Sequence, residues 1–231
     1  MLAVVDIETQ GLDATKFVTA CLLLENGKKE HFYTKEDLWN RIVELGEKEH
    51  KRNRVLNLYG HNHEFDFYGY ADLTNTHLQF FSFRPFIASY SIKGKRAINF
   101  LDSLAIFRMS LKKLGDMIGL EKLETPEEFI EGKELTLSEI KDLEPYLERD
   151  VEIVMEAIKL MKSKIGEEGI QIRRLYTISQ IAISYLMNVL KKDKRNDPQF
   201  FIKDRGILHR PRNKEKIHST SIVTGKQCIT F

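Results

Sequence analysis

The sequence predicts an α/β fold in which helices flank a central mixed β-sheet. Apolar, β-branched runs of strand length open the chain, capping-box patterns mark the starts of helices, and the two kinds of segment alternate along 231 residues. A chain of this length suits one domain, or one domain with an appendage. We therefore expect one sheet-based domain with a C-terminal extension.

The first predicted strand, residues 2–9, carries two carboxylates in an apolar run. Asp6 and Glu8 are two residues apart, so their side chains point to the same face of a strand. Adjacent carboxylates repel each other and are costly to desolvate unless a cation neutralises them. A divalent metal with oxygen ligands meets that need. On this stretch alone, a strand that simply ends at the surface is equally consistent.

Three more strands and a helix follow. Residues 17–25 and 28–33 flank Asn26-Gly27, the strongest short hairpin signal. A capping-box pattern at residues 34–37 opens a helix with a periodic apolar face. Residues 54–59 turn from polar to apolar and predict a fourth strand.

The segment after the fourth strand is rich in polar side chains. Gly60 ends the strand, Asn62 is the expected N-cap of the next helix, and Asp66 falls in its first turn. The helix dipole favours a carboxylate at that position even without a function. His61 and His63 lack third and fourth nitrogen or sulfur ligands at useful spacing, which argues against zinc.

The second half of the chain alternates strands and helices less regularly. Residues 78–103 are strand-like, with a basic turn at Lys93-Gly94-Lys95-Arg96 between two β runs, and a helix follows around residues 110–118. Residues 121–135 are acidic and predict a loop. A capping box at residues 136–139 predicts a further helix.

The last predicted helices carry the remaining candidate residues. Tyr146 and Asp150 are four apart and share one face of a helix. Such a pair can also be a tyrosine hydroxyl that meets a carboxylate at a helix surface. Residues 172–190 predict another helix, after which the chain becomes polar and basic.

Taken in order, these residues form a recognisable set. Asp6-x-Glu8, Asn62-x-x-Phe65-Asp66 and Tyr146-x-x-x-Asp150 resemble the three exonuclease motifs of the DEDD (DnaQ-like) superfamily, tyrosine branch. The resemblance implies a ribonuclease H-like three-layer fold with a β-hairpin insertion and a C-terminal helical and basic extension. Its expected bounds are an exonuclease domain of residues 1–165 and an extension of residues 166–231.

The likeness extends to a narrower family. His61 before Asn62, and the basic hairpin that leads to Asp102-Ser103-Leu104, look like the proofreading domain of protein-primed family B DNA polymerases of phages, viruses and linear plasmids. The stretches Asp-x-x-Ser-Leu-Tyr-Pro and Tyr-x-Asp-Thr-Asp of the polymerase domain are absent from this sequence. We therefore expect no polymerase activity from the chain.

The resemblance also implies the roles of the site residues. Two divalent ions, Mg²⁺ or Mn²⁺, would be held by four acids, namely Asp6, Glu8, Asp66 and Asp150. Tyr146 would orient the attacking water, and Lys122 is the candidate for the family's catalytic lysine. Three residues would bind the 3′ end of a single strand, namely His61, Asn62 and Phe65.

These roles predict a two-metal-ion 3′→5′ exonuclease that acts on single-stranded or mismatched DNA ends, in viral or plasmid DNA replication or repair. An RNA exonuclease is the first alternative, because nothing in the motifs reads a 2′-hydroxyl. The second is an inactive module that binds DNA or a replication partner, such as a separate polymerase subunit or a terminal protein. The oligomeric state stays open.

Composition adds two expectations. No apolar run of membrane-spanning length and no signal-peptide pattern is present, and Cys21 and Cys228 lie far apart, so we expect a reducing cytoplasm, that of the host if the protein is viral. Residues 191–231 contain 11 Lys/Arg and 4 Asp/Glu, a net charge of +7 against +2 for the whole chain. Such a tail could contact phosphates, although solvated basic tails are also common.

Overall fold

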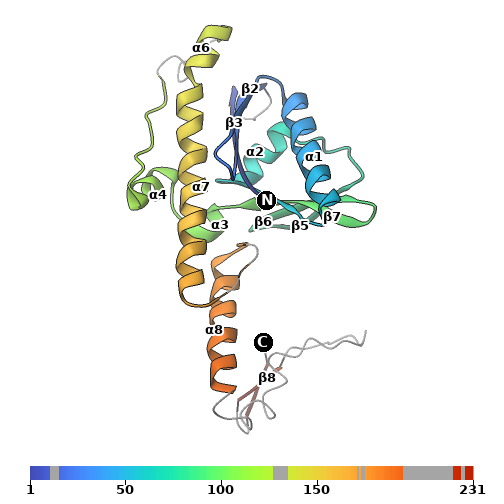
Figure 1. Ribbon diagram of the computed structural model, residues 1–231, viewed down its shortest axis with the longest axis vertical. Helices are drawn as coiled ribbons and strands as arrows, with labels where there is room; N and C mark the ends of the chain where they lie inside the picture. The colour runs from blue at the N-terminus through green and yellow to red at the C-terminus, as the bar shows by residue number, and fades with distance from the viewer. Residues whose placement is uncertain are drawn as a thin grey trace. The chain divides into compact units, whose positions relative to one another are not determined.

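The computed structural model describes residues 1–10, 16–126, 135–170, 172, 175–194, 221–224 and 227–230. Its main element is a seven-stranded sheet with the order β3-β2-β1-β4-β7-β6-β5 (Figure 1). β1 is parallel to β4 and β4 to β7, and the other neighbouring pairs are antiparallel. The strands are β1 (Leu2–Gln10), β2 (Lys16–Leu24), β3 (Lys29–Phe32), β4 (Leu56–Gly60), β5 (Leu78–Phe83), β6 (Phe86–Ile92) and β7 (Lys95–Asp102).

Helices cover both faces of this sheet (Figure 1). The helices in the described part of the chain are α1 (Lys35–Lys51), α2 (His63–Tyr70), α3 (Leu104–Phe107), α4 (Leu111–Ile118), α6 (Leu137–Asp142), α7 (Glu144–Glu167) and α8 (Ile178–Lys194). Ala3 and Val5 of β1 belong to one core with α1 and α2, whereas Leu2 and Val4 belong to another with α4 and α7. This alternation separates the two cores by one sheet. The predicted ribonuclease H-like three-layer fold is confirmed.

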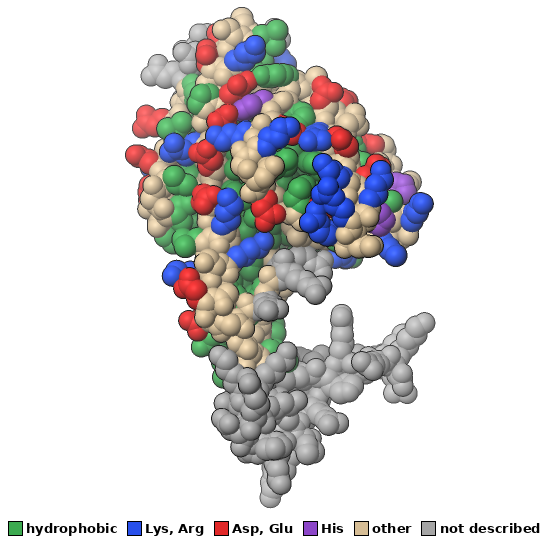
Figure 2. All heavy atoms as spheres, viewed as in Figure 1, with side chains coloured by type: hydrophobic (Ala, Val, Ile, Leu, Met, Phe, Trp, Pro, Cys, Tyr) green, Lys and Arg blue, Asp and Glu red, His purple; other side chains and the backbone are tan. Residues whose placement is uncertain are grey.

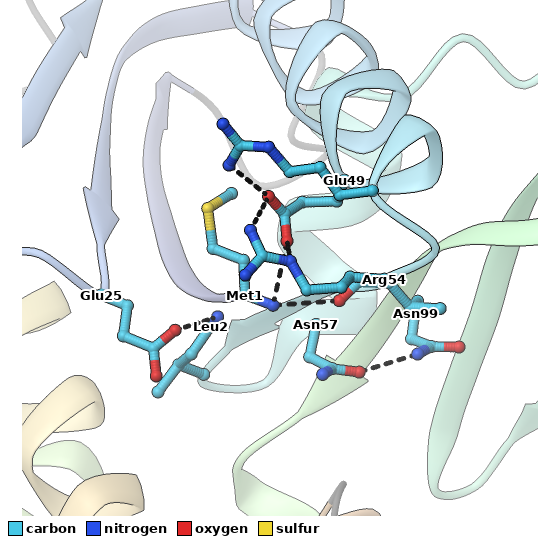
Figure 3. A network of polar contacts seen from close by, with 9 residues as sticks. Met1, Leu2, Glu25, Glu49, Arg54, Asn57 and Asn99 are labelled. Carbon is cyan, nitrogen blue, oxygen red and sulfur yellow. Dashed lines mark hydrogen bonds and ion pairs between the residues drawn. The ribbon is translucent and has the colours of Figure 1, made fainter.

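Polar contacts fix the start of β1 (Figure 3). The backbone amide of Leu2 donates to Glu25 Oε2 over 2.9 Å. The Met1 ammonium lies 3.5 Å from Glu49 Oε2, and Arg54 Nε lies 2.8 Å from the same oxygen. Glu49 is only 1% exposed, so its charge depends on these cations. The network ties β1 to α1 and to the segment before β4, and so determines where the acids of β1 lie.

The long helix α7 is attached to the edge of the sheet by charged contacts. Lys29 Nζ of β3 lies 2.6 Å from both Glu148 Oε2 and Glu152 Oε1, and His31 Nε2 lies 2.9 Å from Glu148 Oε1. Apolar side chains of the same helix fill the core beneath it: Leu147, Val151, Val154 and Ile158. These contacts orient α7 so that its buried side, which carries Tyr146 and Asp150, faces the sheet.

Two predicted elements differ from those observed. Residues 78–103 form three strands instead of two, because Pro85 lies at a second turn between β5 and β6 and has no amide hydrogen for a ladder. The helix predicted over residues 172–190 begins only at Ile178. Its start follows a capping pattern, in which Gln180 N donates to Thr177 Oγ1 and Tyr176 N donates to Gln180 Oε1.

The chain divides into two units, residues 1–181 and 182–231. In the second, β8 (Ser221–Thr224) pairs antiparallel with β9 (Gln227–Thr230). Residues 195–216 of the predicted basic tail, and the predicted turn at residues 11–13, lie outside the described residues. Over the face drawn in Figure 2, acidic and basic side chains are interspersed. Within the described ranges, no helix combines the length and apolar character needed to cross a bilayer.

Candidate active site

The predicted acids of β1 and α2 meet at one edge of the sheet. β1 and β4 are parallel neighbours, so their carboxyl ends lie together, and α2 starts directly after β4. Asp6 and Glu8 have the strand parity of Val4, which places them on the α7 side of the sheet. Gly69 lets α2 approach β1 closely, because a Cβ there would lie 2.5 Å from Ile7 Cδ1.

The charges of the four predicted acids influence one another's pKa values. Burial raises the pKa of Asp6 well above its ordinary value, and the charges of Asp66, Asp150 and Glu8 raise it further, while Lys122 lowers it. Burial, and then the charge of Asp150, raise the pKa of Glu8 to about 7 against the effect of Lys122. The pKa of Asp66 is raised by burial and then by Glu8. The charges of all four predicted acids are thus coupled to one another.

Two of these carboxylates are incompletely paired. Asp66 is 7% and Asp150 is 4% exposed. Their oxygens Oδ2 and Oδ1, respectively, are buried and accept no hydrogen bond within the described part of the chain. Among the described side chains, no three from His, Cys, Asp and Glu are grouped closely enough to hold a metal ion as they stand. Buried, mutually repelling carboxylates with free lone pairs are nevertheless a donor set that suits a hard divalent cation.

Lys122 supplies a positive charge at this site. Its Nζ donates to Tyr146 Oη over 2.9 Å, lies over the Tyr146 ring at 4.2 Å from the centroid, and forms an ion pair with Asp150. Thr125 Oγ1 also donates to Tyr146 Oη, at 3.3 Å. Burial alone would lower the pKa of Lys122, but its hydrogen bonds to Asp150 and Tyr146 and the Asp150 charge raise it overall. Burial raises the pKa of Tyr146. The lysine stays charged and the tyrosine stays neutral near pH 7.

The end of α4 determines where Lys122 lies. Gly119 terminates the helix in the left-handed region at φ +76°, and Leu120 N donates to Gly115 O over 2.9 Å. A Cβ on Gly115 would lie 2.3 Å from the Leu120 carbonyl oxygen. The two glycines therefore allow the chain to fold back against α4 just before Lys122.

Asn62 is the N-cap residue of α2, as predicted, but another side chain makes the capping hydrogen bonds. Asn62 occupies the N-cap position but makes no capping hydrogen bond with its side chain, because its backbone is left-handed at φ 62°. Asp102 takes over this role, since its Oδ1 accepts from Asn62 N at 2.9 Å and from His63 N at 3.4 Å. The Asn62 side chain is exposed, as is that of Phe65, which is 44% exposed. Both are therefore available to a ligand.

The histidines of this segment are engaged by the protein. His61 Nδ1 lies 2.9 Å from Ser103 Oγ and its Nε2 lies 3.0 Å from Met109 O. His63 is fully buried, with Nδ1 2.8 Å from Leu101 O and Nε2 2.7 Å from the hydroxyl of Tyr70. Burial lowers the pKa of His63 to about 4. The structure thus places His61 beside the site with both ring nitrogens already occupied.

Sequence reasoning missed Asp102 and Thr125 as parts of this site. Asp102 lies 40 residues beyond Asn62, so nothing local indicates that its carboxylate organises α2. The only signal was the Asp102-Ser103-Leu104 stretch, which carries the family resemblance. Thr125 lies within the predicted acidic loop of residues 121–135 and has no local signal.

Comparison with known proteins finds similarity in the fold. No protein-family model matches the chain, and no curated protein matches it. Phi29 DNA polymerase complexed with primer-template DNA and incoming nucleotide substrates is similar at a TM-score of 0.57 and 15% identity, over 84% of this chain and 35% of that one. The same polymerase complexed with single-stranded DNA gives a TM-score of 0.51 at 15% identity, over 84% and 36%.

A more distant likeness is to the family B DNA polymerase from the hyperthermophilic archaeon Pyrobaculum calidifontis, with a TM-score of 0.48 and 12% identity over 72% of this chain and 25% of that one. The chain spans about a third of the length of the Phi29 polymerase chains. At these identities, the likeness to Phi29 DNA polymerase shows a shared fold.

Proposed function

We propose that this chain is a metal-dependent 3′→5′ exonuclease that removes nucleotides from the 3′ end of single-stranded DNA. The observation that carries the proposal is the convergence of Asp6, Glu8, Asp66 and Asp150 on one site beside Tyr146 and Lys122. The shared fold with Phi29 DNA polymerase supports a role in DNA replication, either within a longer polymerase or beside a separate polymerase subunit or terminal protein.

The four acids are the groups that would hold the metal. The free lone pairs on Asp66 and Asp150, and the mutual repulsion that raises the pKa of Asp6, suit two Mg²⁺ or Mn²⁺ ions with oxygen ligands. When bound, such ions polarise the phosphate and lower the pKa of water. Binding through Asp150 competes with its ion pair to Lys122.

Tyr146 acts in this proposal as a hydrogen-bond donor. Its hydroxyl oxygen accepts from Lys122 and Thr125, so the hydroxyl proton remains to be donated. Because its pKa is raised, the phenol stays neutral and is neither a nucleophile nor a base near pH 7. Donation of this proton would orient the attacking water or a phosphate oxygen.

Lys122 provides a fixed positive charge. The raised pKa keeps its ammonium protonated, so it cannot take a proton from water. An ammonium held by Tyr146 and Asp150 beside the scissile phosphate would stabilise the negative charge that develops in the transition state. Its second effect is to hold the Tyr146 hydroxyl in one orientation.

The substrate end would be held by exposed side chains at the start of α2. The Asn62 amide is free of capping bonds and can hydrogen-bond a base or a sugar, and Phe65 offers an exposed ring on which an unpaired base can stack. A duplex end must fray to supply such a base. This arrangement favours single-stranded and mismatched ends over paired ones.

The test uses purified protein with 5′-labelled and 3′-labelled single strands of DNA and RNA, in Mg²⁺, Mn²⁺ or EDTA. The expected result is a ladder of shortened 5′-labelled DNA, with mononucleotides released from the 3′ label only when metal is present. An Asp6→Asn protein is the control for contaminating nucleases. Cleavage of circular single strands, which have no 3′ end, would show endonuclease activity instead of the proposed exonuclease activity. Faster hydrolysis of the RNA strands than of the DNA strands would show that the preferred substrate is RNA.

A further inference from the structure

A cavity of about 560 Å³ lies beside the proposed active site. Its wall includes Asn62, residues 83–86 at the turn between β5 and β6, Arg108 after α3, and Thr177 at the start of α8. All of these residues belong to the unit of residues 1–181. Because Asn62 is shared with the proposed substrate site, a strand bound there can continue into the cavity.

Two arginines of the cavity wall have no acidic partner within the described residues. Arg84 and Arg108 are both exposed, and neither forms an ion pair with a described carboxylate. By contrast, Arg41 and Arg54 are each paired with a glutamate within 2.9 Å. Two guanidinium groups left free at one cavity are suited to bind an anion, and arginine matches phosphate with paired hydrogen bonds.

The backbone conformation of Arg108 is a further argument that its side chain has a role. Arg108 has φ 50° and ψ 36°, a left-handed conformation that is strained for a non-glycine residue. It ends the four-residue helix α3, where glycine would serve without strain. A strained arginine at the cavity wall therefore supports a role for its side chain.

The cavity also contains two carboxylates with different roles. Asp102 Oδ1 accepts hydrogen bonds from three backbone amides, those of Asn62, His63 and Leu104, so its charge is largely compensated. Glu64 lies in the first turn of α2 and has no described hydrogen-bond or ion-pair partner. Glu64 is therefore the one described acid of the wall whose charge would oppose an incoming phosphate.

An aromatic ring completes the wall. Phe83 is 52% exposed, yet its ring is stacked on Phe80 at 5.7 Å with an interplanar angle of 15°. Phe80 in turn packs edge-on against the buried Phe67 at 5.9 Å. This series of contacts holds an exposed ring in place next to Arg84, and a fixed ring beside a cation is the pattern that binds an unpaired base and its phosphate.

We propose that this cavity is a second nucleotide subsite, which binds an internal nucleotide of the single strand whose 3′ end lies in the active site. Arg84 and Arg108 bind the backbone phosphate, and the base stacks on Phe83. The inference rests on the proposed function, because the strand reaches the cavity past Asn62. It predicts that the protein binds single strands longer than a dinucleotide more tightly than it binds a dinucleotide.

The test measures binding without hydrolysis. Fluorescence anisotropy in EDTA is recorded for 5′-labelled oligothymidylates of two, six and ten nucleotides with the wild type, Arg84→Gln, Arg108→Gln and Phe83→Leu. Each substitution should weaken binding of the longer strands by about tenfold and leave the dinucleotide unaffected. The arginine variants should also reduce the salt slope by about 0.7 for each phosphate that the protein no longer neutralises.

Two matched variants sharpen the result. Glu64→Gln removes the opposing charge and should tighten binding of the longer strands severalfold, whereas Lys159→Gln, at an exposed position of α7, should change nothing. Because Arg84, Arg108 and Phe83 are exposed, their variants should melt at the wild-type temperature.

The outcomes separate the two proposals. Unchanged affinity and salt slope in both arginine variants, or no binding of long strands by the wild type, would overturn the subsite. If the arginine variants bind long strands more weakly and the wild type hydrolyses no strand, the subsite is supported and the proposed exonuclease activity is refuted. If the arginine variants hydrolyse strands and bind all strand lengths as tightly as the wild type, the proposed exonuclease activity is supported and the proposed subsite is refuted.

Discussion

The ammonium of Lys122 donates a 2.9 Å hydrogen bond to the hydroxyl of Tyr146 and is paired with Asp150, one turn further along α7. The three side chains therefore form one hydrogen-bonded group, although Lys122 is 24 residues distant from Tyr146. Lys122 therefore influences both the orientation of the Tyr146 hydroxyl and the charge pairing of Asp150.

This dependence predicts non-additive losses of activity. Tyr146→Phe should reduce single-turnover rates by on the order of 10-fold and Lys122→Met by on the order of 10²-fold, because the first removes an orienting hydrogen bond and the second a charge. The double variant should lose less than the product of the two, since each substitution disrupts the same group. Fully multiplicative losses would show that the two residues act independently.

Asp6 should be the most sensitive acid. It is the residue whose pKa is raised by all three other acids, after the effect of burial, so a metal ion that neutralises the four acids depends most on its charge. Asp6→Asn should lower turnover by on the order of 10³-fold or more while the fold is retained. Rates are measured on a single-stranded 3′ end, with circular dichroism as the folding control. A loss no larger than that of Tyr146→Phe would contradict the assigned roles.

Metal binding should also appear as pH-dependent stability. Glu8 has its pKa raised from 4.5 to about 7, so the folded, metal-free protein binds a proton more tightly than the unfolded chain. This contribution is fully present below pH 4.5 and is lost as the pH rises through 7. Mg²⁺ replaces the proton, so it should raise the melting temperature more at pH 8 than at pH 5.5.

Asp6→Asn provides the control for this measurement. Removal of one carboxylate reduces the repulsion at the site and also removes a metal ligand. The variant should therefore be at least as stable as the wild type without metal, and Mg²⁺ should have little effect on it. An equal Mg²⁺-induced shift in both proteins would place the bound metal elsewhere.

Much of the architecture could be predicted from local sequence. Alternation of faces in a strand put Asp6 and Glu8 on one side of β1, and the capping box at Thr136 and Glu139 is present as predicted. Long-range contacts could not be predicted in this way. Asp102 reaches back 40 residues to organise α2, and a side chain that satisfies a helix N-terminus from another strand leaves no periodic signal.

A second limit concerns helix starts. The apolar periodicity of residues 172–190 gave no indication that the helix begins only at Ile178. The Thr177 and Gln180 side chains mark that start, and Tyr59 Oη further holds the preceding segment through both backbone groups of Leu175. Tertiary contacts at Leu175 therefore override a helical pattern that the local sequence favours.

The network at the start of β1 predicts a separate pH effect. Burial would raise the pKa of Glu49, but hydrogen bonds and charges from Arg54 and the terminal ammonium lower it overall. Glu49 therefore stabilises the fold above its unfolded pKa of about 4.3, and this contribution is lost as the pH falls through its lower folded value. Glu49→Gln should cost about 2 kcal/mol at pH 7, measured by urea unfolding. The difference between the two proteins should shrink toward pH 3, and a difference independent of pH would refute the ionic role.

Gly115 should act on catalysis through position. An alanine at residue 115 places Cβ 2.3 Å from the Leu120 carbonyl oxygen, which must move and carry Lys122 with it. Gly115→Ala should therefore lower the turnover number toward that of Lys122→Met, change the KM for single strands much less, and add little loss when combined with Lys122→Met. The clash should also cost about 1–3 kcal/mol of stability, so turnover is compared well below the melting temperature.

Gly166→Ala is the matched control for that experiment. Gly166 also lies in a helix, near the end of α7, but a Cβ there would meet nothing within 4 Å. This substitution should leave turnover unchanged and raise stability by up to about 1 kcal/mol, because alanine has the higher helix propensity. If folded Gly115→Ala protein retained wild-type turnover, the segment before Lys122 would tolerate the displacement, and the close approach at Gly115 would serve only the packing of α4.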